Sequence, residues 1–135
     1  MSPMATIPIG LSGESQVIVT SDIAISFLGH QQARVLATPW MIAHMEMVSR
    51  DTVKPRLLDD EDTVGTQVNV SHLAATPLGR KVTFKTKVLQ VNGQRVLFQV
   101  EAWDGDTIVG QGTHERFIIN VTRFAARLVD KYGAA

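Results

Sequence analysis

The sequence lacks several residue patterns, and each absence excludes a class of protein. It contains no cysteine, which excludes disulfides, thiolate metal sites, thiol nucleophiles and redox switches and fits a reducing compartment. Thirteen basic and thirteen acidic side chains give a formal net charge of zero, so the overall field that attracts nucleic acids or anionic membranes is missing. Residues 1–13 carry neither the charged start of a signal peptide nor a long apolar run. We therefore expect a cytoplasmic protein with no nucleic-acid or membrane partner.

The length indicates one domain. At 135 residues, without internal repeats, the chain has a common single-domain size and can bury roughly 70% of its unfolded surface. We expect residues 1–13 to form a flexible or extended arm of this domain. The four histidines show no spacing typical of metal ligands, and we expect neither a metal nor a cofactor.

The second half of the sequence alternates apolar and polar residues in the manner of long antiparallel strands. The predicted strands are Val64 to Ala75, Lys81 to Val91, Gln94 to Asp104 and Thr107 to Ile119. Turn signals separate them at Thr76–Gly79, Asn92–Gly93 and Asp104–Asp106, and the last two are typical of tight hairpins. A shorter strand, Glu14 to Thr20, is predicted in the first half.

A long helix is predicted to begin after Thr38 and Pro39 and to run towards Val53. From Trp40 to Val48 it is apolar nearly all the way round, which is typical of a buried helix. A buried helix followed by an antiparallel meander predicts an α+β hotdog fold, with the sheet wrapped around a central helix. A short amphipathic helix with a packing role is predicted at the C-terminus from Val121, Phe124, Ala125, Leu128, Val129 and Tyr132, with Gly133 as its stop.

Glu46 is a carboxylate in the most apolar part of the predicted central helix. An isolated buried carboxylate is strongly unfavourable, so Glu46 is paired, protonated or directed into a wet pocket. A place at the helix margin, or a structural pair with an arginine, explains the residue equally well. His44 points about 200° away from Glu46 around the helix, which indicates a structural role for that histidine.

His72 is the ionisable residue of the first long predicted strand. Alternation places it on one face with Val64, Thr66, Val68, Val70 and Ala74, and places Gln67, Asn69 and Ser71 on the wetter face. A histidine on an apolar strand face is by itself more typical of a core than of a catalytic site. Glu46 is directed into the same layer from the helix, and two buried titratable groups in one space are typical of a functional site.

Two further positions are suited to chemistry and also have ordinary structural explanations. Thr38 is expected to cap the helix, and its hydroxyl lies beside free N–H groups and the positive dipole end that would stabilise an oxyanion. In the last predicted strand Arg116 shares a face with Gly110, Gly112 and His114, where the glycines leave room for a backbone or a ligand. Arg116 pairs with Glu46 or an anionic ligand, or is a structural arginine.

Several short segments, together with Glu46 and His72, recur in a specific order and spacing. They are Ala37–Ile42 followed by Glu46, Thr63–Gly65 followed by His72, Thr76–Gly79, and Gly112–Arg116. Together, over about residues 14–125, they resemble the fluoroacetyl-CoA thioesterase-like family. The resemblance implies a hotdog-fold enzyme that hydrolyses a small acyl-CoA without a cofactor. It further implies catalysis by Thr38, Glu46 and His72, and substrate binding by Gly65, Pro39 and Arg116. It also implies a homodimer with active sites at the subunit interface, and two such dimers would give a dimer of dimers.

One segment departs from the family pattern. Gly29–Arg34 is polar, whereas the fluoroacetate-specific member closes its acyl pocket with phenyl groups just before the helix, so fluoroacetyl-CoA is not the expected substrate. Two other functions on this fold stay open, namely hydration or dehydration of an acyl thioester and binding of acyl-CoA without turnover. The sequence specifies neither the acyl group nor whether an acyl-Glu46 anhydride forms.

Overall fold

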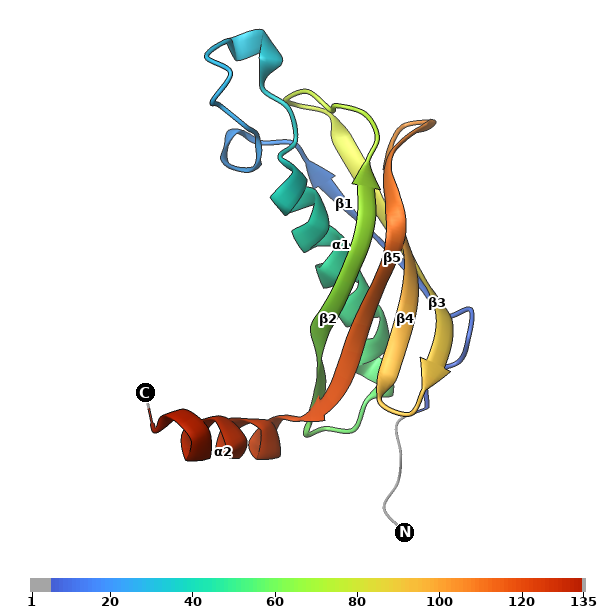
Figure 1. The fold of residues 1–135 in the computed structure, drawn as a ribbon. Helices are drawn as coiled ribbons and strands as arrows, with labels where there is room; N and C mark the ends of the chain where they lie inside the picture. Colours follow the sequence, from blue (N-terminus) through green and yellow to red (C-terminus); the bar gives the residue numbers. More distant parts are fainter. Residues whose placement is uncertain (1–5, 135) are drawn as a thin grey trace.

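The protein is a five-stranded antiparallel sheet that curves around one long helix (Figure 1). A computed structural model describes residues 6–134. In chain order the main elements are β1 (Ser12–Ile18), α1 (Thr38–Val53), β2 (Glu61–His72), β3 (Lys81–Asn92), β4 (Arg95–Asp104), β5 (Thr107–Asn120) and α2 (Val121–Tyr132). Short 3-10 helices occupy Ser21–Ile23, Gln31–Ala33 and Lys54–Arg56. The strand order is β1-β3-β4-β5-β2, so β1 and β2 form the two edges of this sheet.

The meander from β3 to β5 follows the predicted pattern closely. Alternate residues of β3 and β4 face α1 and are buried, namely Val82, Phe84, Thr86, Val88, Val96, Phe98, Val100 and Ala102. The hairpin turns contain Gly93 with φ of 61° and Gly105 with φ of 58°, a conformation that favours glycine. The predicted hairpins are therefore confirmed.

Strand β2 differs from its prediction in bounds and in side-chain orientation. It ends at His72 because the N–H groups of Leu73 and Ala74 both donate to the carbonyl of Val109, which stops the ladder. A bulge at Thr66 shifts the pairing, since Gly65 lies opposite Arg116 and Gln67 lies opposite Glu115.

One extra residue in a strand inverts the alternation on one side of the bulge. Val68, Val70 and His72 therefore share the face directed at α1 with Thr63 and Gly65. The expectation that Val64 and Thr66 belong to that face is wrong.

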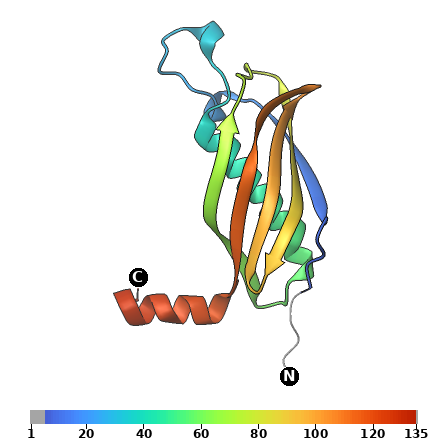
Figure 2. The ribbon, with the colours of Figure 1, turned by 45° about the vertical axis from the view of Figure 1, so that its right-hand side comes forward.

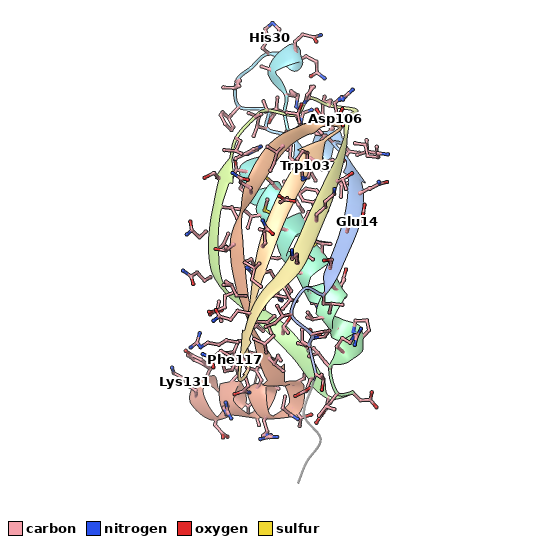
Figure 3. All side chains as sticks on the ribbon, turned by 90° about the vertical axis from the view of Figure 1, so that its right-hand side faces the viewer. Glu14, His30, Trp103, Asp106, Phe117 and Lys131 are labelled. Carbon is pink, nitrogen blue, oxygen red and sulfur yellow. The ribbon has the colours of Figure 1, made fainter. Side chains whose placement is uncertain are left out.

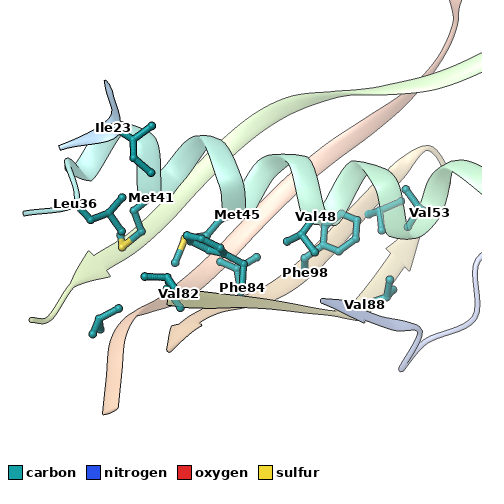
Figure 4. Close-up of a cluster of buried hydrophobic side chains, with 14 of the residues drawn as sticks. Ile23, Leu36, Met41, Met45, Val48, Val53, Val82, Phe84, Val88 and Phe98 are labelled. Atoms are coloured by element: carbon teal, nitrogen blue, oxygen red, sulfur yellow. The ribbon is translucent and has the colours of Figure 1, made fainter. Parts of the chain in front are cut away.

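Helix α1 begins one residue earlier than predicted and ends at Val53 as expected, but it is buried on one side only. Its buried side packs against the sheet through Met41, Met45, Val48 and Val53, which contact the layer containing Val82, Phe84, Val88 and Phe98 (Figure 4). On its other side Trp40 is 44% exposed and Met47 is 52% exposed. The prediction of a helix buried all round is thus wrong for the single chain.

The described part of the N-terminal segment contacts the domain at Ile7 and Gly10, while Ile9 between them is 69% exposed. Ile7 belongs to the core, and the N–H of Gly10 donates to the carbonyl of Val88 at 2.8 Å. β1 begins two positions earlier than predicted and pairs with β3. Residues 1–5 lie outside the described part of the chain.

Helix α2 extends away from the sheet. It leaves the end of β5 and passes the edge strand β2 in both views of the ribbon (Figures 1 and 2). Every one of its residues is exposed, so the packing role predicted for it is not fulfilled within one chain. Among residues 6–134, no helix has the length and apolar character needed to cross a membrane.

Candidate active site

Thr38 and His72 meet at the start of α1. The Thr38 hydroxyl oxygen lies 2.7 Å from Nδ1 of His72, and the two residues come from the helix start and the last position of β2. Thr38 does not cap the helix. The N-cap is Ala37, which makes no side-chain cap hydrogen bond, and this leaves the Thr38 side chain free to bind the histidine.

His72 is arranged to stay neutral. Burial lowers the pKa of its imidazole below the ordinary value, because a charged ring is poorly solvated there. Its Nε2 atom is buried and has no hydrogen-bond partner within residues 6–134. A neutral ring with one nitrogen engaged by Thr38 and the other available is suited to accept or relay a proton.

A pocket opens beside this pair. It has a volume of about 380 Å³ and is lined by residues that include Ile25, Phe27, Val35, Thr38, His72 and Leu73. Most of this lining is apolar, with the Thr38–His72 pair as its polar part. A small acyl group of modest polarity therefore fits the chemistry of the pocket.

The helix start offers fewer backbone donors than predicted. The N–H groups of Trp40 and Met41 both donate to the carbonyl of Ala37, at 3.1 and 3.0 Å, and Pro39 has no N–H. The amide of Thr38 has no backbone acceptor among the described residues. An oxyanion at this end would thus meet one amide and one hydroxyl, both from Thr38.

Glu46 belongs to a second cluster, around Gly65 of β2 and Arg116 of β5. Oε1 of Glu46 lies 3.5 Å from Nη1 of Arg116 and 3.9 Å from Nε2 of His114. A methyl group at position 65 would clash with Oε1 of Glu46. Gly65 is therefore the position that lets the carboxylate approach the sheet.

Arg116 is fixed by the strand beside it. Its Nε donates to the hydroxyl of Thr63 at 2.7 Å, and its Nη2 donates to the carbonyl of Thr63 at 2.9 Å. Burial lowers the pKa of Arg116, and the Glu46 carboxylate opposes that shift. The predicted pair between Arg116 and Glu46 is present.

His114 is a site residue that the sequence reasoning missed. Its Nδ1 donates to the carbonyl of Gln67 at 2.8 Å, and since a carbonyl only accepts, this fixes the tautomer and leaves Nε2 as an acceptor. Nη1 of Arg116 lies 3.2 Å from that Nε2. Burial above all, with the Arg116 charge adding to it, lowers the pKa of His114. The alternation of β5 placed it correctly, but nothing in its spacing indicated contact with Glu46.

The two clusters are separate within one chain. Thr38 and Glu46 are eight residues apart on α1, which corresponds to ~12 Å along the helix axis. On the sheet, His72 lies opposite Gly110 whereas Gly65 lies opposite Arg116, a separation of ~20 Å along β2. Glu46 and His72, expected to converge, do not meet inside a single protomer.

The remaining predicted residues have clear positions. Pro39 follows Thr38 in the first turn and is exposed, where it removes a backbone donor. A methyl group at Gly110 would clash with Met41, and one at Gly112 with the backbone of Asn69, so both glycines serve close packing. His44 stacks on Phe84, with ring centroids 5.3 Å apart, as its predicted structural role requires.

The polar segment before α1 does not line the pocket, and its arginine binds the chain upstream. Nε of Arg34 donates to the carbonyl of Ile25, and its Nη atoms donate to Ser21 and Ala24. The aromatic ring near Thr38 is Phe27, which lines the pocket and is 80% exposed. Phe27 lies just upstream of the polar segment Gly29–Arg34, and its place in the pocket was not predicted from the sequence.

A metal site is not formed by the described residues. No group of three or more histidine, aspartate or glutamate side chains among residues 6–134 is arranged to hold an ion. The chemistry of the two clusters is that of one hydroxyl, two imidazoles, one carboxylate and one guanidinium.

Comparisons with solved structures first show the class to which this protein belongs. A Thermus thermophilus protein described as a thioesterase superfamily member superposes with a TM-score of 0.85 at 31% identity, covering 98% of this chain and 100% of that chain. A variant of the fluoroacetyl-CoA thioesterase FlK in complex with acetyl-CoA superposes with a TM-score of 0.84 at 29% identity, covering 93% of this chain and 99% of that chain. The fold is the hotdog fold of this superfamily, as predicted.

The family follows from sequence. The model of the fluoroacetyl-CoA-specific thioesterase family matches residues 18–122. Fluoroacetyl-CoA thioesterase of Streptantibioticus cattleyicolor is 38% identical over 97 residues, which are 72% of this chain and 70% of that protein. The chain belongs to the fluoroacetyl-CoA-specific thioesterase family.

Proposed function

We propose that the protein hydrolyses the thioester of a small acyl-CoA to a free acid and CoA. The observation that most directly supports this function is the Thr38–His72 pair at the start of α1, which lies beside a pocket large enough for a small acyl group. The named activity of the curated relative and the acetyl-CoA complex of a related structure support it. The segment Gly29–Arg34 contributes no phenyl group, and the ring that does line the pocket, Phe27, is 80% exposed, so we expect a substrate other than fluoroacetyl-CoA.

We further propose that the working unit is a homodimer in which β2 pairs with β2 of a second copy. β2 is an edge strand, and long unpaired edges are normally covered. Met47 and Trp40 of α1 are large apolar side chains exposed in the single chain. A second copy beside β2 would cover this surface.

The register of such a pair follows from symmetry. A two-fold axis perpendicular to the sheet keeps each side chain on its own face, so residues that lie opposite each other must face the same way. Thr66 lies in the bulge and has no ladder position. Without it, Gly65 is three ladder positions before Asn69, and His72 is three positions after Asn69. An axis at Asn69 therefore places Gly65 opposite His72 of the partner subunit, with both directed at the helices.

This register brings the two clusters together across the interface. Directly opposite residues in antiparallel strands lie ~5 Å apart, and the Glu46 carboxylate lies against Gly65. Each site then combines Thr38 and His72 of one subunit with Glu46, Arg116 and His114 of the other. Nε2 of His72, buried without a partner in one chain, faces the other subunit's carboxylate in this arrangement.

The proposed chemistry uses a water molecule between Glu46 and His72. His72 donates from Nδ1 to the Thr38 oxygen, and the Thr38 hydroxyl donates to the thioester carbonyl oxygen together with its own amide. The water's two hydrogens are accepted by the Glu46 carboxylate and by Nε2 of His72. As the water oxygen bonds to the carbonyl carbon, its proton passes to Glu46. The C–S bond then breaks, and the thiolate leaves without an obligatory strong acid because its pKa is about 8.5.

Direct attack by Glu46, which would form an anhydride, uses the same residues. Neither route requires a metal or a cofactor. The expected location is the cytoplasm, which fits a chain without cysteine.

The shared site is tested with purified heterodimers carrying one substitution in each subunit. When Glu46→Gln in one subunit is combined with His72→Ala in the other, one of the two sites stays intact, and we expect about half of wild-type thiol release. The matched control combines Thr38→Ala with His72→Ala, which damages both sites because these two residues act within one chain. An inactive first heterodimer would contradict the shared site.

The reaction class is tested with a panel of short, branched, aromatic and halogenated saturated acyl-CoAs. Release of free thiol from at least one of them is the expected result. Hydration of enoyl-CoAs without thiol release would instead indicate a hydratase, and tight binding without any turnover would indicate a binding module.

A further inference from the structure

Helix α2 is a well-formed helix that makes few contacts with its own chain, and all of its residues are exposed. Its start is capped by Asn120, whose side chain accepts from the N–H of Arg123 at 3.0 Å. Its end is closed at Gly133, which has φ of 83° and donates to the carbonyl of Val129 at 2.7 Å. Isolated helices of twelve residues are marginal in water, and tertiary packing normally supplies their stability. This helix therefore needs a surface against which to pack.

The two faces of α2 differ in chemistry. One face is apolar and consists of Val121, Phe124, Leu128, Val129 and Tyr132, all of them exposed. Beside it, Arg123, Arg127 and Lys131 are spaced four residues apart and form a basic stripe along the helix. Arg123, Phe124 and Arg127 line a groove with Asp60 and Phe117 of the same chain. Leu128, Val129 and Tyr132 do not line that groove and remain for another surface.

That surface does not belong to the same chain's acyl pocket. His30, on the loop before α1, and Lys131, on α2, lie at opposite ends of the molecule (Figure 3). The helix is directed past the free edge of β2 (Figures 1 and 2). It points to the side on which the second copy is proposed to pair.

The proposed register identifies where α2 arrives on the second copy. The helix starts beside Glu61, since Asn120 lies opposite that residue. Glu61 is seven ladder positions before Asn69 when Thr66 is left out, so the same distance after Asn69 lies beyond His72, where the β2 ladder has ended. α2 therefore crosses the partner subunit at the level of its Leu73–Thr76 segment. A twelve-residue helix spans ~18 Å, enough to cross two strands at ~5 Å spacing.

The surface at that level is apolar and exposed. Phe27, Leu28 and Leu73 are large apolar side chains that are exposed in the single chain, and Phe27 and Leu73 line the pocket beside Thr38. We propose that α2 of each subunit packs its apolar face onto Phe27, Leu28 and Leu73 of the partner subunit and forms the outer wall of the partner's acyl pocket. This inference rests on the proposed dimer, and it makes α2 a determinant of which acyl groups the pocket accepts.

Disulfide trapping tests the contact directly, because the native chain has no cysteine. In the double variant Phe27→Cys with Leu128→Cys, we expect oxidation to join two subunits covalently. The matched control pairs Phe27→Cys with Arg127→Cys, one position away on the basic stripe, and should stay largely uncrosslinked. Equal crosslinking in both variants, or crosslinking in the control alone, would overturn the proposal.

A third variant separates failure of this inference from failure of the dimer. Asn69→Cys lies at the proposed two-fold axis and should crosslink to its own copy. If it does and the Phe27–Leu128 pair does not, the placement of α2 is wrong while the dimer stands. If neither crosslinks, the dimer fails and the α2 placement fails with it.

The effect on the reaction is measured with Leu128→Ser and Arg127→Ser, both on α2 and both away from the catalytic groups. We expect Leu128→Ser to raise KM for the preferred acyl-CoA about tenfold and to reduce the discrimination between short and longer acyl chains, with kcat much less affected. Arg127→Ser should leave the acyl-chain profile unchanged. An unchanged profile for Leu128→Ser, with the dimer intact in sedimentation velocity, would contradict a role of α2 in the pocket wall.

Discussion

The hydroxyl oxygen of Thr38 lies 2.7 Å from Nδ1 of His72, although 34 positions separate the two residues in the sequence. The contact joins the first residue of α1 to the last residue of β2. It exists because the chain ends the β2 ladder at His72 and because Thr38 is not used as a helix cap. A hydroxyl fixed by a half-buried imidazole at a helix start is pre-organised for a carbonyl oxygen.

The hydroxyl of Thr38 should therefore matter more than its methyl group. We expect Thr38→Ala to lower kcat by about 100-fold, the usual effect of removing one oxyanion donor, and Thr38→Ser to stay within about tenfold of wild type because it keeps the donor. Thiol-release kinetics on the preferred acyl-CoA measure both. Equal losses in the two variants would indicate that the methyl group, and not the hydroxyl, is what the site requires.

Gly65 should be needed for the position of Glu46. A methyl group at position 65 would clash with the flexible end of the Glu46 side chain, so Gly65→Ala displaces the carboxylate at little expense to the fold. We expect turnover to fall by about 100-fold, with a loss of unfolding free energy below about 1 kcal/mol.

Gly110→Ala is the matched control. A methyl group there would clash with the buried Met41, and overpacking a core costs about 1–3 kcal/mol. Urea unfolding and thiol-release rates of both variants separate the two effects. A Gly65→Ala enzyme with normal turnover would show that Glu46 needs no close approach to the sheet.

Much of the fold was predictable because its signals are local. Asn92–Gly93 and Asp104–Asp106 specify hairpins by turn chemistry, and the alternation in β3 and β4 specifies which side chains are buried. The helix that ends at Val53 was also predicted, with its start placed one residue too late. Each of these features depends on residues within one turn or one strand.

The errors concern information that is not local. The bulge at Thr66 inverts the alternation in β2, and it is visible only in the pairing of β2 with β5. The apolar side of α1 that carries Met47 signals burial, but the sequence does not say whether the same chain or another molecule covers it.

The sequence named candidate site residues but not their arrangement. Glu46 and His72 were expected to converge, yet the register of β2 with β5 places them in separate clusters of one chain. His114 and Phe27 were missed because a contact with Glu46 and a place beside Thr38 depend on the folded arrangement. For the candidate residues, the sequence indicated the residue types and the strand or helix faces on which they lie.

Arg116 should be irreplaceable even by lysine. Its guanidinium donates to the hydroxyl and the carbonyl of Thr63 and also lies beside Glu46, and a single ammonium group cannot reproduce that fork. We expect Arg116→Lys to lose about 1–3 kcal/mol of unfolding free energy and to lower turnover through the misplaced Glu46. Chemical denaturation and steady-state kinetics measure the two effects, and wild-type values in both would remove Arg116 from the positioning of the carboxylate.

The stability of the protein should fall in mild acid because of His114. Burial lowers the pKa of this histidine in the native state, whereas in the unfolded chain it titrates near its ordinary value of about 6.5. Between those two pKa values the unfolded state binds a proton that the native state does not. The stabilisation is thus complete above about pH 6.5 and is lost as the pH falls through and below that value.

His114→Gln isolates this contribution, because a glutamine amide can still donate to the carbonyl of Gln67 but does not titrate. His44 and His72, whose pKa values are also lowered by burial, remain in both proteins and cancel in the comparison. We expect the unfolding free energy of wild type to drop more steeply than that of the variant between pH 7.5 and pH 5, a range set by the ordinary histidine value of about 6.5. Urea unfolding at several pH values measures the two slopes. If they are parallel, His114 is not held neutral in the native state, and Nε2 cannot be the acceptor that faces Arg116.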